Sequence, residues 1–234
     1  MQNSEREIWW TLVGAQEFLD DHAAEVGGVA SNGARRNLDA TVSAITSHLS
    51  AQSEHKMLAQ TLTRSGTEAQ RALVQDHLGV IAAVARAELP LVPELVVVRR
   101  LPEVRTSVGA LLTRAQDVVT AVTPFADTFV AGGLPAHFIT QLQGAADAVA
   151  QLKTRRDASI DKRQGATVGI SAQLVVGRRH IRILNTQVRT ALRGADPSLY
   201  KEWKARVALP RAKPALVTVT PAAPPAAAVV AAAA

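Results

Sequence analysis

The stretch of sequence that decides the fold is residues 135–193, which read PAHFITQLQGAADAVAQLKTRRDASIDKRQGATVGISAQLVVGRRHIRILNTQVRTALR. It begins with a proline and continues without another, and as one α-helix it would be about 85 Å long. Apolar side chains share one helical face in its first third, Phe138 to Leu152, and again at nearly heptad spacing in its last third, Ile170 to Leu192. The middle, Arg155 to Gly169, is polar and basic. We therefore predict one long helix over residues 136–193 with two packing ends and a polar waist.

Residues 34–88 are predicted to form a second helix of similar length. Ser31 and Asn32 are its candidate N-caps, and it ends before Pro90 because the residue preceding a proline avoids the α region. Its apolar stripe lapses between Gln52 and Glu68. Residues 65–68, Ser-Gly-Thr-Glu, have the form of a capping box, so the sequence allows the helix to break and restart there.

Two shorter helices are predicted at the ends of the chain. A capping box at Ser4 precedes an amphipathic helix over residues 4–26, which the glycine pair at 27–28 ends. Asp196 and Pro197 give an N-cap and a first helical residue for a short helix over residues 197–208. From Pro210 onward the chain is mostly proline and alanine, so we expect residues 210–234 to be disordered.

The middle of the chain is predicted to hold one more helix after an apolar connector. The connector, residues 89–101, has room for a short helical turn starting at Pro93. Pro102 is a suitable first residue for a helix over residues 102–131, which Pro124 should kink and the glycines at 132–133 should end.

These elements predict an all-α protein built as an elongated antiparallel helical bundle. Short connections make sequential helices antiparallel neighbours. The two long helices (about 34–88 and 136–193) are shared by two lobes, with the short helices 4–26 and 102–131 and the C-terminal helix 197–208 packed on them. Residues 1–209 then form a single bundle, with one lobe from 4–62 and 167–208 and the other from 66–157. If the two long helices align end to end, residue i of one lies near residue 229 − i of the other.

Composition limits the class of protein. The apolar residues are mostly Ala, Val and Leu, which suits helix packing, and the absence of cysteine excludes disulfides and thiolate metal sites. We find neither a signal peptide nor an apolar run long enough for a transmembrane helix, so we expect a soluble cytoplasmic protein.

Positive charge is concentrated in the second half of the chain. Residues 1–103 carry 9 Lys+Arg and 13 Asp+Glu, whereas residues 104–234 carry 17 and 7. Four arginines fall within about 60° of the surface of the second long helix: Arg178, Arg182, Arg189 and Arg193. One interpretation is a surface for anions or a nucleic-acid backbone, and the other is pairing with the acidic helix 4–26, which the predicted register places alongside.

The polar waist is a second candidate site. If the second long helix is uninterrupted, Arg156 and Arg163 occupy its apolar stripe and face Lys56, Arg64 and Glu68. Three interpretations remain open. In the first, only two helices pass here and the arginines extend to solvent. In the second, the waist is an anion pocket or a hinge, weakened by Gly66, Gly165 and Gly169. In the third, the helices break.

Trp10 is a candidate interface residue, because it projects nearly opposite the apolar stripe of its helix. The alternative is that the C-terminal helix covers it through Trp203.

No arrangement of residues indicates catalysis. The sequence lacks HExxH, P-loop, dinucleotide and triad contexts, and His48 and His55 are only a weak hint of a metal site. We therefore expect no enzyme activity, no metal and no cofactor. The leading hypothesis is a non-enzymatic structural or protein-interaction protein, with a protein partner or a second copy bound through helix faces. The alternative is a basic protein that binds nucleic acid or another anionic surface through the four arginines.

Overall fold

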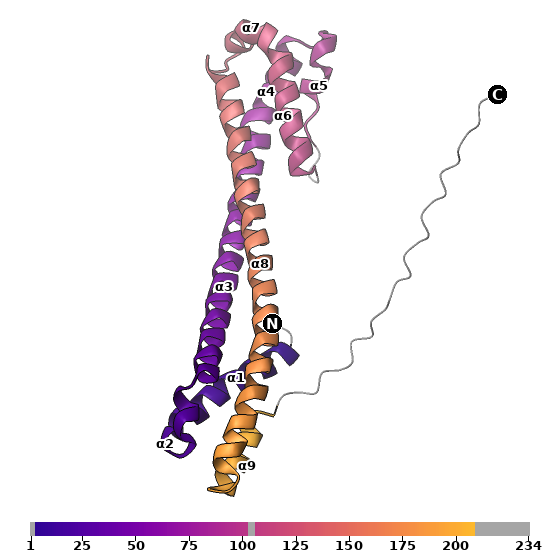
Figure 1. Ribbon diagram of the computed structural model, residues 1–234. Helices are drawn as coiled ribbons and strands as arrows, with labels where there is room; N and C mark the ends of the chain where they lie inside the picture. The colour runs from indigo at the N-terminus through magenta and orange to yellow at the C-terminus, as the bar shows by residue number, and fades with distance from the viewer. Residues whose placement is uncertain (1–2, 103–105, 209–234) are drawn as a thin grey trace, which may run out of the picture.

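The computed structural model describes residues 3–102 and 106–208, and within these ranges it contains helices and their connections without any strand. Two long helical stretches run antiparallel and side by side, with shorter helices gathered at both ends (Figure 1). The prediction of an all-α, elongated antiparallel bundle is therefore confirmed. The proline- and alanine-rich tail, residues 210–234, lies outside the described residues.

The first long stretch consists of α3 (Gly33–Ala72), a π-helical segment η2 (Leu73–Leu78) and α4 (Gly79–Glu88). Asn32 is its N-cap, since its side chain accepts a hydrogen bond from the Arg35 amide at 3.0 Å. The possible restart at Ser65 does not occur. The helix continues because Leu62 before this point and Leu73 after it both stay buried against neighbouring helices.

The second long stretch is the single helix α8 (Phe138–Leu192), which follows the prediction for residues 136–193 closely. Its buried residues include the apolar positions predicted for both of its ends, from Phe138 and Leu142 at one to Val188 and Leu192 at the other. It is followed by α9 (Pro197–Arg206), whose N-cap Asp196 accepts from the amides of Ser198 and Leu199 at 3.0 and 2.9 Å, as predicted.

The N-terminal helix differs from the prediction in two details. Helix α1 (Asn3–Asp21) already includes Asn3, so Ser4 lies inside the helix and is not its N-cap. The predicted span 4–26 is interrupted at His22, after which α2 (Ala23–Val26) and the 3-10 segment η1 (Gly27–Ser31) lead into α3. Gly27 has φ 55°, a conformation that favours glycine and ends the helix.

The connector and the third predicted helix form several short elements. Pro93 starts a 3-10 turn, η3 (Pro93–Leu95), which continues as α5 (Val96–Arg99), and Arg99 donates to the Leu89 carbonyl at 3.1 Å. The next helix, α6 (Val108–Val122), does not begin at Pro102, because Ser107 is the residue that caps it, through the Ala110 amide.

Pro124 interrupts this helix as predicted. The 3-10 turn η4 (Thr123–Phe125) contains it and separates α6 from α7 (Ala126–Ala131). Gly132 and Gly133 then end α7, with φ 98° at Gly133.

Buried apolar side chains form two clusters at opposite ends of the long helices. The first joins α1, α2 and α9 to the start of α3 and the end of α8, with Phe18 and Trp203 among its fully buried side chains. The second joins η2, α4, α5, α6 and α7 to the start of α8, around Phe129 and Phe138. Between the clusters, α3 and α8 are the only described helices that run together (Figure 1).

The register of α3 against α8 differs from the predicted one by ten residues. Asn32 donates to Gln187 at 3.0 Å and Gln52 donates to Thr167 at 2.7 Å, so the residue numbers of each pair sum to 219 rather than 229. The prediction assumed that the long helices end together. Instead α4 extends past the start of α8 to pack on α7, and α8 extends past the start of α3 to pack on α9.

Candidate interaction surfaces

The waist between the two clusters is a pair of continuous helices, so neither helix breaks there. The residues buried between them are small or apolar: Ala59 and Leu62 of α3, and Ser159 and Ala166 of α8. Arg156 and Arg163 are half-buried beside this contact rather than within it. The two arginines are therefore partly exposed to solvent and are not buried between the helices.

The structure brings together only some of the five predicted waist residues. Lys56 and Arg163 line one open groove of about 550 Å³, next to the Gln52–Thr167 hydrogen bond. Arg156 lies elsewhere and pairs with the adjacent Asp157 at 2.8 Å. Arg64 and Glu68 are exposed and line neither that groove nor the smaller one that contains Arg156.

Two of the glycines near the waist serve close packing. A Cβ at Gly169 would lie 2.6 Å from the imidazole of His48, and one at Gly177 would lie 2.5 Å from Cδ1 of Leu12. At Gly165, by contrast, nothing lies within 4 Å. The glycines at 169 and 177 thus let α3 and α1 approach α8 closely, a role that the sequence pattern did not reveal.

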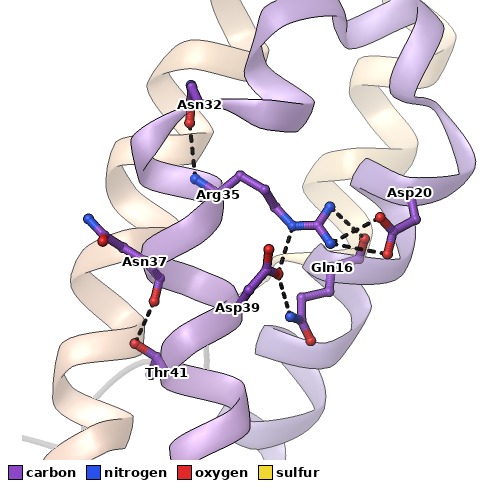
Figure 2. Close-up of polar contacts among 7 residues, drawn as sticks. All are labelled: Gln16, Asp20, Asn32, Arg35, Asn37, Asp39 and Thr41. Atoms are coloured by element: carbon purple, nitrogen blue, oxygen red, sulfur yellow. Dashed lines mark hydrogen bonds and ion pairs between the residues drawn. The ribbon is translucent and has the colours of Figure 1, made fainter.

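A cluster around Arg35, which sequence reasoning missed, fixes α1 to α3 (Figure 2). Arg35 is buried, and its Nε donates to Asp39 at 2.8 Å while its Nη2 donates to Asp20 of α1 at 3.1 Å. Gln16 of α1 also donates to Asp39. Burial lowers the pKa of Arg35, but the hydrogen bonds and charges of Asp39 and Asp20 outweigh it and leave the pKa raised.

The Arg35 cluster is a structural clamp rather than a ligand site, because its charges are already paired within the chain. The Arg35–Asp39 spacing of four residues was a signal that could have been found in the sequence. The partnership with Asp20 depends on the tertiary fold.

The four arginines of the predicted stripe lie toward the end of α8. Arg182, Arg189 and Arg193 are exposed, whereas Arg178 is half-buried. Within the described ranges the buried Nε of Arg178 has no hydrogen-bond partner. One interpretation paired this stripe with the acidic N-terminal helix, but Asp20 and Asp21 of α1 pair instead with Arg35 and Arg206.

The two candidate interface tryptophans have opposite environments. Trp10 is 63% exposed, so the expectation that Trp203 covers it is wrong. Trp203 is fully buried, its ring lies 5.1 Å from that of Phe18, and its Nε1 donates to Asn185 at 3.1 Å. Trp203 is therefore a core residue of the first cluster, and only Trp10 is available to a partner.

The outer face of α8 carries exposed apolar side chains that were not predicted from the sequence. Val168 and Val175 are 69% and 70% exposed, and Val176 and Ile183 are also exposed. At 100° per residue, Val168 and Val175 project away from the buried Ile170 and Leu174. This part of α8 is apolar on two sides, and the described residues cover only the inner side.

Two further features are absent from the described part of the chain. It contains no group of three or more His, Asp or Glu side chains placed to hold a metal ion. None of its helices combines the length and the apolar composition needed to cross a membrane.

No protein-family model matches this sequence, and no significant similarity was found to a curated protein or to a solved structure.

Proposed function

We propose that this protein is a non-enzymatic helical interaction protein that binds another polypeptide through the outer face of α8. The observation that carries the proposal is the exposure of Val168 and Val175, in the middle of a helix whose other side is well packed. Exposed apolar groups arranged along one helix face are typical of surfaces that another helix covers.

The shape of the molecule supports this role. Two apolar clusters hold the ends of α3 and α8, and the paired helices keep those ends apart (Figure 1). Such a rod presents α8 as a long, continuous surface. The cysteine-free sequence suits a reducing compartment, and we propose a cytoplasmic setting.

Site-specific photo-crosslinking in the native host tests the proposal. A photoreactive amino acid at position 175 is expected to form a polypeptide adduct, and the same amino acid at the exposed Thr113 of α6 is expected to form none. The adduct should disappear when Val168→Asp is added, because a buried charge is costly. Equal labelling at both positions, or no adduct at 175, would overturn the proposal.

A second candidate function is binding of nucleic acid or another polyanion through Arg178, Arg182, Arg189 and Arg193. The observation that favours it is that none of the four takes part in an ion pair within the described residues. Duplex binding should then fall steeply with salt and be lost on replacement of all four by Gln. Absence of binding at about 50 mM salt would rule this candidate out.

A further inference from the structure

The outward residues of α8 at seven-residue spacing form a line with an ordered chemical character. They are Thr154, Asp161, Val168, Val175, Arg182 and Arg189, all of them exposed. Seven residues fall about 20° short of two helical turns, so these side chains form a stripe that turns slowly around the helix, by about 100° over its whole length. We call this line the outer seam. Its first two residues are polar and acidic, its middle two are valines, and its last two are arginines.

The outer seam is complementary to itself when it is turned end for end. A two-fold axis placed between Val168 and Val175 brings each valine opposite the other valine of a second copy. The same axis brings Asp161 opposite Arg182, and Thr154 opposite Arg189. A parallel arrangement would instead place Asp161 against Asp161 and Arg182 against Arg182, which is repulsive.

We infer that the occupant of the outer seam is a second copy of this chain, paired antiparallel through α8. This inference rests on the proposed function and names its partner. Charge complementarity favours a second copy. The outer seam is acidic at one end and basic at the other, so in an antiparallel pair each acidic end meets a basic end. An isologous contact, in which both copies use the same surface, requires this kind of self-complementarity. A polyanion would match only the arginine end of the seam and would be repelled at Asp161.

Among the described residues, the outer seam is exposed to solvent and its charged side chains are not paired. Asp161 and Arg182 form no ion pair in the part of the chain that the structure describes. Ser171, which donates to Glu5 of α1 at 2.7 Å, lies close to the proposed axis, so the start of α1 borders the seam. It does not cover Val168 or Val175, which remain about two-thirds exposed.

Charge reversal tests the pairing. Light scattering of the purified full chain should give twice the monomer mass of 24.8 kDa at high concentration. Asp161→Arg alone and Arg182→Asp alone should each raise the dimer dissociation constant about tenfold, because the two-fold axis repeats each change. The combined swap should restore the wild-type value. Asp117→Arg, on the exposed side of α6, is the matched control and should leave the dissociation constant unchanged.

Cysteine pairing tests the direction and the register, and the chain suits this experiment because it has no cysteine of its own. A mixture of Val168→Cys and Val175→Cys chains should form disulfide-linked dimers faster than either variant alone. Faster linkage of either variant with itself would indicate a parallel or shifted pairing and would overturn the inference.

The outcomes separate this inference from the proposed function. A monomer at about 100 µM, or a combined swap that does not restore association, overturns the second copy as partner. If the photoreactive group at position 175 then labels a different polypeptide, the proposed function stands without the inference. If it labels nothing, both are wrong.

Discussion

Gly177 of α8 lies directly against Leu12 of α1: a Cβ at position 177 would be 2.5 Å from Cδ1 and 2.9 Å from Cδ2 of that leucine. Leu12 is fully buried, so a shift of its side chain would disturb the residues packed around it. The absence of a side chain at residue 177 therefore allows α1 to pack on α8.

Gly177→Ala is expected to destabilise the first cluster by about 1–3 kcal/mol, because overpacking outweighs the gain in helix propensity. Gly165→Ala is the matched control. Since nothing lies within 4 Å of its Cβ position, it should stabilise the protein by up to about 1 kcal/mol. Urea unfolding followed by tryptophan fluorescence measures both. A stabilising Gly177→Ala would mean that Leu12 shifts to make room for the new methyl group, and that the glycine is not required for this packing.

The Arg35 clamp gives the second prediction. Arg35→Ala should cost about 1–2 kcal/mol, because it removes the contacts to Asp39 and Asp20 and leaves both carboxylates without their cation. Asp20→Asn should cost less than about 0.5 kcal/mol, because Asp20 is largely exposed and screened by solvent. The free energy of unfolding at neutral pH measures both. Equal costs would show that Arg35 contributes only through its ion pair with Asp20.

The tryptophans give a third prediction, since all three lie on α1 and α9. Trp203→Ala should cost about 3–5 kcal/mol, because it empties the centre of the first cluster. Trp10→Ala should change stability by less than about 0.5 kcal/mol, because the side chain is mostly exposed. Thermal unfolding followed by circular dichroism measures both. A large loss in Trp10→Ala would place Trp10 in the core.

The contacts of Gly177 and Arg35 show which features of the fold could be predicted from the sequence and which could not. Periodicity located the long helices and their buried residues, because a helix that packs along its length repeats apolar residues every three to four positions. The buried run from Ile170 to Leu192 was predictable in this way. The role of Gly177 was not predictable, because it depends on which residue of α1 packs against α8 at position 177.

The register and the outer seam were missed for related physical reasons. Helix lengths alone suggested that the long helices end together, whereas α7 and α9 pack on the overhanging ends. The apolar residues on the outer side of α8 were overlooked because the heptad pattern of the inner side already accounted for a packed helix. Only the exposure of Val168 and Val175 shows that the helix has a second apolar side.

The last prediction concerns acid and the N-cap of α9. The backbone N–H of Leu199, followed by contacts from Ser198, lowers the pKa of Asp196 below its ordinary value. Because the folded state holds this carboxylate ionised, its stabilising effect is present above the unfolded pKa, about 3.9, and is lost as pH falls through the lower folded pKa.

Asp196→Asn should keep the cap but lose this acid dependence, since asparagine caps as well as aspartate does. Asp196→Ala should weaken the docking of α9 at all pH values. Trp203 fluorescence during unfolding at about pH 6 and about pH 3 reports the difference. If wild type and Asp196→Asn lose stability equally on acidification, other carboxyl groups are responsible and the cap does not contribute through its charge.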